Sequence, residues 1–163
     1  MTVRMRSLYV LCTIFGFSIV AHAEIKPERD GINIADSSDC ILFYTRPVLD
    51  DLSVEQTIEE ATHIVLPCSP SPGDTNTIRA SAAVVRQFRQ PESKAVIVLN
   101  MVKANTILAE EAPDVLRNEI GLPVLRTAIP DRQCIQRAIL GGWKALDAET
   151  QTEVFKLALE ITT

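Results

Sequence analysis

Few residues of this 163-residue chain have types and spacing that suit bond-breaking chemistry. Only two His and four Cys are present, and Cys68 lies beside prolines with no His at ligand spacing, so the pattern does not indicate a metal site. His63 has no evident nucleophile partner and no Gly-x-Ser-x-Gly turn occurs, so hydrolase chemistry has little support. The remaining candidates are residues that follow or flank apolar runs and could bind a ligand, namely the polar Thr45, Asn100, Asp131 and Arg132 and the apolar Pro130.

Strand-length apolar runs alternate with helical patterns from Asp39 onward, and these elements must position the candidates. Strands are predicted at 40–44, 63–66, 95–99 and 123–129, with helices at 53–61, 74–88, 107–120, 132–140 and 149–161. The run at 95–99 is apolar on both faces, which is typical of a parallel strand covered on both sides. The predicted fold class is therefore α/β, with three layers and a mostly parallel sheet between helices on both faces.

Single residues predict where several of these elements begin and end. Pro67 is expected to end the second strand, and Asp74 or Thr75 is expected to cap the helix that follows. Pro113 is expected to kink the 107–120 helix or divide it in two, and Gly121 suits the position just after its end. Because ligands bind at the carboxyl ends of parallel strands, the candidate site is the set of loops that begin at these positions: Tyr44, Pro67, Asn100 and Pro130.

These loops, taken together, resemble the ParA/MinD family of deviant-Walker partition ATPases, particularly the small plasmid-partition type. The segment V-L-P-C-S-P-S-P-G-D resembles that family's strand-Pro-x-x-Pro-Ser-Pro-x-Asp segment, and V-L-N resembles its strand ending in an adenine-contacting Asn. The four segments that carry the likeness are 65–74, 98–100, 125–133 and 138–142. The resemblance implies an incomplete P-loop NTPase-like fold over 24–163.

The resemblance also implies roles for the candidate residues. Asn100 would contact adenine, a wall formed by 130–132 would close over the base, and Thr45 would lie near the phosphates, so ATP or ADP is the expected ligand. Each residue also has an ordinary structural role open to it. Asn100 suits a turn, Asp131 suits a helix N-cap, and Thr45 suits a strand end without any function.

Two departures from the family predict that this chain does not hydrolyse ATP alone. None of its six glycines belongs to a K-G-G-x-x-G-K-[ST] phosphate loop. Tyr44 stands where the family has a strand-end Asp, and a neutral phenol is a poor partner for Mg²⁺, so Mg²⁺ is not expected. Asp50 and Asp51 could substitute for the missing carboxylate or could simply cap a helix.

Possible partners follow from the same resemblance. It implies a homodimer and a ParB-like centromere-binding protein, and relatives bind DNA non-specifically through basic residues. The net charge of −5 favours a solvated role for the scattered Lys and Arg residues here, and leaves DNA binding open. The residues concerned are Arg79, Arg86, Arg89, Lys94, Lys103 and Arg117.

The first 23 residues have two interpretations. Arg4 and Arg6 precede an apolar run over 8–20 that ends in Ala-His-Ala at 21–23, which is the layout of a secretory signal. In that case an exported, periplasmic α/β binding domain would begin near Glu24. Alternatively, 18–25 forms an extra strand that fills the gap left by the family's central P-loop strand. The second interpretation, with a cytoplasmic protein that does not meet the membrane, is slightly favoured by the family resemblance.

Overall fold

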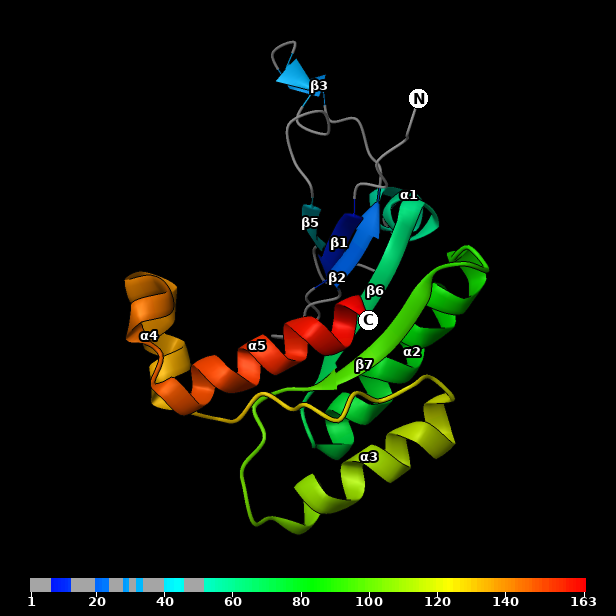
Figure 1. The fold of residues 1–163 in the computed structure, drawn as a ribbon. Coiled ribbons are helices and arrows are strands. Elements are labelled where there is room, and N and C mark those ends of the chain that lie inside the picture. Colours follow the sequence, from blue (N-terminus) through cyan, green and yellow to red (C-terminus); the bar gives the residue numbers. More distant parts are fainter. Residues whose placement is uncertain (1–6, 13–19, 24–27, 30–31, 34–39, 46–51) are drawn as a thin grey trace. The chain divides into compact units, whose positions relative to one another are not determined.

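The computed structural model describes residues 7–12, 20–23, 28–29, 32–33, 40–45 and 52–163 (Figure 1). The amino-terminal elements are β1 (Ser7–Cys12), β2 (Val20–Ala23), β3 (Glu28–Arg29), β4 (Ile32–Asn33), β5 (Cys40–Thr45), α1 (Leu52–Glu60) and β6 (Ala61–Cys68). They are followed by α2 (Pro72–Phe88), β7 (Lys94–Leu99), α3 (Ile107–Ile120), α4 (Gln133–Gly141), the short 3₁₀ helix η2 (Gly142–Ala145) and α5 (Ala148–Thr162). The chain forms two compact units, Met1–Leu66 with Ala80–Ala95 (the first unit) and Pro67–Arg79 with Val96–Thr163 (the second unit).

The first unit contains most of the strand pairing. β1 and β5 run parallel, with Ser7 opposite Cys40 and Cys12 opposite Thr45, and β1 also bridges β6 in parallel. β2 is antiparallel to both β1 and β6. The main sheet has the order β5-β1-β2-β6-β7, so β1 and β2 lie between β5 and β6. The predicted α/β class with a mostly parallel sheet is confirmed, and β2 is its antiparallel member.

Apolar side chains on neighbouring elements form the core of the first unit. Val54 and Ile58 of α1 are 1% exposed, and Ile64 of β6 is fully buried. The buried hydroxyl of Ser93 donates to the carbonyl of Ala61 at 2.6 Å, and so ties the turn before β7 to the start of β6.

β6 is longer than its sequence predicts. Pro67 was expected to end it, but the strand continues to Cys68, whose carbonyl accepts a hydrogen bond from the Asn100 amide at 2.8 Å. Proline lacks an amide donor, yet its fixed φ is compatible with extended backbone, so one missing donor does not end this strand.

α2 begins earlier than predicted. Its first residue is Pro72, and the Ser71 hydroxyl accepts from the Asp74 amide at 3.3 Å, so Ser71 caps the helix. The expectation that Asp74 or Thr75 would be the cap is wrong, because proline at the first helical position supplies the preset φ and needs no acceptor for an amide.

α3 is one continuous helix despite Pro113. Thr106 caps its start by accepting from the Ala109 amide, and Gly121 ends it in the left-handed conformation at φ 69°, as predicted. Pro113 removes one backbone hydrogen bond without dividing the helix. Leu116 and Ile120 are each 1% exposed, so their burial anchors α3 in the second unit.

The segment 122–131 was expected to contain a regular fourth strand, and this prediction is wrong. It pairs with the β7 region in parallel at only two isolated bridges, Ile97 with Val124 and Val102 with Pro130. Between the bridges the amides of Arg126 and Thr127 donate to the carboxylate of Glu160 on α5 instead. The carboxylate of Glu160, distant in sequence, therefore supplies the acceptors at the point where the segment is not paired with the β7 region.

The carboxyl-terminal helices α4 and α5 agree with the predicted ranges to within one or two residues. Among the described residues, no helix combines the length and apolar character needed to cross a lipid bilayer.

Candidate functional site

A cavity of about 310 Å³ lies in the second unit, where the loops after β6 and β7 meet the end of the 122–131 segment. Its lining residues are Ser69, Pro70, Ser71, Met101, Lys103, Thr106, Leu108 and Asp131. Three of the four loops predicted to form the site begin near this cavity. A volume of this size is at the lower end of the range of small-molecule pockets.

The loop after β6 forms one wall, and internal hydrogen bonds fix its shape. The Ser69 hydroxyl donates to the Asp74 carboxylate, and the Ser71 amide donates to the Ser69 carbonyl at 2.8 Å. Thr75 Oγ1 donates to the Ser71 carbonyl at 3.1 Å. Behind this wall, burial and the charge of Asp74 raise the pKa of the Cys68 thiol to about 12, so this thiol is not a nucleophile near neutral pH.

The loop after β7 has an unusual backbone. Met101 and Asn105 both lie in the left-handed region, at φ 55° and 61°. Asn tolerates this conformation, whereas Met enters it at an energetic cost that the surrounding structure must offset. The hydroxyl of Thr106 donates to the Lys103 carbonyl at 2.9 Å and helps to close the loop. Strained backbone of this kind is concentrated at ligand sites, which supports a functional role for the cavity.

The charges at the cavity consist of one cation and one anion. The Lys103 ammonium lies 4.0 Å from the Asp131 carboxylate, with side chains 75% and 29% exposed. The hydroxyl protons of Ser69 and Thr106 are already donated, to Asp74 and to the Lys103 carbonyl. The charged pair and the Ser71 hydroxyl can still hydrogen-bond a neutral polar group such as the edge of a base. The cavity does not suit a triphosphate, because Lys103, the one cation among the described residues that line the cavity, is already paired with a carboxylate. The residues present therefore fit the base of a nucleotide better than its phosphates.

The structure brings only some of the predicted site residues together. Asp131 lines the cavity, and Pro130 is held against Val102 by a parallel bridge. Asn100 follows β7 directly, but its side-chain oxygen accepts from the Met101 amide at 2.9 Å, which is the turn-forming role. A base contact from Asn100 stays a prediction, and its side-chain nitrogen, which has no hydrogen-bond partner among the described residues, is the atom that could make it.

Arg132 has a different environment from Asp131. It is the N-cap residue of α4, so Asp131 is not that cap, and its guanidinium is bonded to the start of α5. Nη1 donates to Asp147 at 3.3 Å and to Thr150 at 3.2 Å, and Nη2 pairs with Glu149 at 2.6 Å. The hydrogen bond and charge of Glu149 raise the pKa of Arg132. These bonds occupy the groups that would otherwise close over a base.

Two predicted features lie in the first unit or outside the described residues. Thr45 ends β5 in the first unit, and its contribution to a phosphate site stays a prediction. Asp50 and Asp51, considered as replacements for the missing carboxylate, lie outside the described residues. Within the described part of the chain, no three His, Cys, Asp or Glu side chains come together as a metal site requires.

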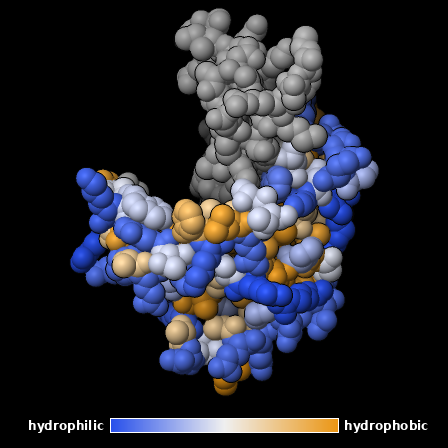
Figure 2. All heavy atoms as spheres, in the orientation of Figure 1, coloured by the Kyte–Doolittle hydropathy of each residue, from blue (hydrophilic) through white to orange (hydrophobic). Residues whose placement is uncertain are grey.

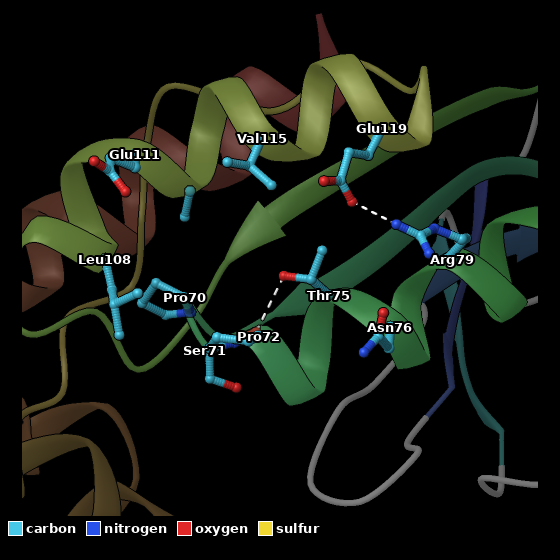
Figure 3. Close-up of a pocket in the computed structure, with 11 residues that line it drawn as sticks. Pro70, Ser71, Pro72, Thr75, Asn76, Arg79, Leu108, Glu111, Val115 and Glu119 are labelled. Carbon is cyan, nitrogen blue, oxygen red and sulfur yellow. Dashed lines mark hydrogen bonds and ion pairs between the residues drawn. The ribbon is translucent and has the colours of Figure 1, made fainter.

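A second hollow, of about 370 Å³, separates the start of α2 from α3 (Figure 3). Leu108 and Val115 of α3 line one side, and Thr75 and Asn76 of α2 line the other. It is adjacent to the cavity described above, because Pro70, Ser71 and Leu108 line both. Arg79 and Glu119 join its two walls through an ion pair at 2.5 Å.

Sequence reasoning missed several residues that line the cavity. Lys103 was grouped with scattered surface cations, although its position in the loop directly after the buried strand β7 could have indicated a place at the site. Met101 carries no such signal, since methionine is not a residue type that favours the left-handed region. Glu160 was also missed, because it lies thirty-three or more residues from the amides it binds.

Exposed apolar side chains mark the carboxyl-terminal helices of the second unit. Figure 2 shows hydrophobic residues gathered on the visible face of α5. Phe155 and Leu159 are four residues apart on this helix and are 63% and 52% exposed, and Trp143 of η2 is 51% exposed. Apolar groups at this spacing form one stripe of a helix.

Comparison with solved structures identifies the fold. The chain is similar to a ParA family ATPase from Chlorobium tepidum TLS, with a TM-score of 0.62 and 20% sequence identity over 78% of this chain. The match covers 52% of that protein, so this chain spans about half its length. No protein-family model and no curated protein matches the sequence. The chain therefore shares the α/β fold of this structure over the matched part, in agreement with the fold class predicted from the sequence.

Proposed function

We propose that this protein is a relative of the ParA partition ATPases that binds the base of an adenine nucleotide and does not hydrolyse ATP by itself. The observation that carries the proposal is a base-sized cavity at the carboxyl ends of β6 and β7 in a ParA-like fold. In this proposal Asp131 and the side-chain amide of Asn100 contact the base, Pro130 packs against it, and Arg132 contributes less.

Catalytic silence is supported by the sequence. The phosphate loop of the family has no counterpart among the six glycines, and Tyr44 replaces the carboxylate that would act beside Mg²⁺. Phosphoryl transfer depends on these groups for positioning and charge stabilisation. We therefore expect ATP and ADP to bind with similar, weak affinity and to need no Mg²⁺.

A titration tests nucleotide binding. Calorimetry with millimolar ATP or ADP, with and without Mg²⁺, should give measurable heats that Asp131→Ala reduces strongly. Asp114→Ala is the matched control, because this exposed carboxylate also pairs with one cation, Arg117, but lies outside the cavity. Flat heats for the unmodified protein would overturn the binding proposal, and Mg²⁺-dependent ATP hydrolysis would overturn catalytic silence.

We also propose a protein-interaction role, in a homodimer or with a ParB-like partner. The exposed stripe formed by Phe155 and Leu159 supports such a surface, since large apolar groups in water are often contact residues. Light scattering after size-exclusion chromatography measures the oligomeric state. A dimer that Phe155→Ser converts to a monomer supports the proposal, and a monomer at every concentration removes the homodimer from it.

For the location of the protein we propose that β1 and β2 remain part of the fold, in the cytoplasm. The support is the pairing of β1 with β5 and β6, and of β2 with β1 and β6. The alternative is an exported binding domain that begins near Glu24. Intact-mass measurement of the natural product distinguishes them, because cleavage after Ala23 would remove both strands.

A further inference from the structure

α5 contacts the 122–131 segment near the carboxyl end of the helix. Glu160 Oε1 accepts from the Arg126 amide at 2.7 Å, and Oε2 accepts from the Thr127 amide at 3.0 Å. Burial raises the pKa of Glu160, but the two amides, the Thr127 hydroxyl and the charge of Arg126 lower it more, so the carboxylate is ionised at neutral pH. An ionised carboxylate that accepts two backbone amides forms hydrogen bonds stronger than those between neutral groups.

The start of α5 contacts the same stretch of chain at its other end. Asp147 caps the helix by accepting from the Thr150 amide at 2.8 Å and also accepts from Arg132. Thr150 is fully buried and accepts from Arg132 as well. One helix therefore holds residues 126–127 at one end and residue 132 at the other.

Between these two contacts lie the residues that border the cavity. The Ile129 amide donates to the Leu99 carbonyl at 2.8 Å, and the Val102 amide donates to the Ile129 carbonyl at 3.0 Å. The Asp131 amide donates to the Val102 carbonyl at 2.9 Å. The Leu125 amide donates to the Ile97 carbonyl at 2.8 Å, so residues 126–128 are the stretch between two points that are bonded to the β7 region. Glu160 fixes the path of this stretch, which leads directly into the backbone of residues 129–131.

We propose that Glu160 is a positioning residue, and that the docking of α5 through Glu160 sets the place of Asp131 at the cavity and hence the affinity of the cavity for its ligand. The ligand part rests on the proposed nucleotide function, whereas the positioning part does not. Glu160 itself does not line the cavity, so it acts only through the backbone of 126–131.

The test combines amide hydrogen exchange with ADP titration of the full chain. In Glu160→Ala, exchange should accelerate at Arg126 and Thr127 and also at Asp131, and the Kd for ADP should rise about tenfold. Glu160→Gln keeps one acceptor oxygen and should give an intermediate result, which also covers a folding failure of the alanine variant. Glu153→Ala is the matched control, because Glu153 lies on the same helix and pairs with a side chain of that helix, Lys156, at 2.9 Å.

Two outcomes would overturn this inference. The first is faster exchange at Arg126 and Thr127 with no change at Asp131, and the second is faster exchange at all three amides with an unchanged Kd. If the unmodified protein binds no ADP, the proposed function fails, and the exchange at Asp131 alone then decides whether Glu160 positions this residue.

Discussion

Two carboxylate contacts in the second unit differ in what they hold together. Glu119 meets Arg79 at 2.5 Å across an open hollow, with side chains 45% and 55% exposed. Glu160 meets two backbone amides at 2.7 and 3.0 Å and replaces the acceptors that a neighbouring strand would supply. We expect the shorter contact to be the weaker one energetically, because solvent screens an exposed ion pair, whereas Glu160 makes two charge-assisted hydrogen bonds to backbone amides.

The comparison implies that buried side chains, and not the ion pair, hold α3 in place. Leu116→Ala should lower the free energy of unfolding by about 2–5 kcal/mol, because it leaves a cavity under the helix. The adjacent Val115→Ala is the control, since Val115 is 38% exposed and should lose less than about 1 kcal/mol. Denaturant titration measures both, and equal losses would contradict this account of α3.

The Glu160 contact should have the next largest effect. Glu160→Ala removes the acceptor for two amides and should lower the free energy of unfolding by about 1–2 kcal/mol. Glu153→Ala, on the same helix, should stay within about 0.5 kcal/mol. If Glu160→Ala lost no more unfolding free energy than the control, the Glu160 contact would be as weak as the exposed ion pair of Glu119.

Asp147 should make the stability of the protein depend on pH in the acid range. Hydrogen bonds from Thr150 and Cys134, and the charge of Arg132, lower the pKa of Asp147 from 3.8 to about 2. Because the folded state favours the ionised form, its stabilising contribution is present above pH 3.8 and is lost as the pH falls to about 2. Asp147→Ala should remove this part of the acid dependence in unfolding measurements between about pH 5 and pH 2. An unchanged acid profile would show that Asp147 does not contribute to it.

The smallest effect is expected at the exposed ion pair. Arg79→Ala should change the free energy of unfolding by less than about 1 kcal/mol, and the change should shrink further in high salt. A double-mutant cycle with Glu119→Ala measures the coupling directly. A coupling above about 2 kcal/mol would reverse the ranking of the two contacts.

Local patterns predicted the elements whose structure depends on local interactions. The β7 strand was predicted from its apolar run, and the end of α3 from Gly121, since both signals act within a few residues. The start of α2 was misplaced by two residues because Ser71 and Pro72 together form a better helix start than Asp74. In each of these cases the relevant chemistry lies within one turn of the boundary.

Tertiary interactions decided what the sequence could not. The expected strand at 123–129 is interrupted by Glu160, and no pattern near Arg126 indicates a carboxylate so far along the chain. The cavity lies where two of the predicted strands end, but the sequence did not indicate that Arg132 is bonded to α5 or that Met101 has a left-handed backbone. The contributions of Thr45 and Asn100 to ligand binding stay predictions.

The reactivity of the thiol at the end of β6 can report local opening of this strand. Cys68 is fully buried, and burial together with the charge of Asp74 raises its pKa to about 12. Alkylating reagents, which react with the thiolate, should therefore modify Cys68 only when that end of the strand opens. Cys134 is partly accessible and serves as the reference thiol, because its alkylation does not require such opening. The ratio of their labelling rates, followed by peptide mass spectrometry, would therefore report how often the end of β6 next to the cavity opens locally.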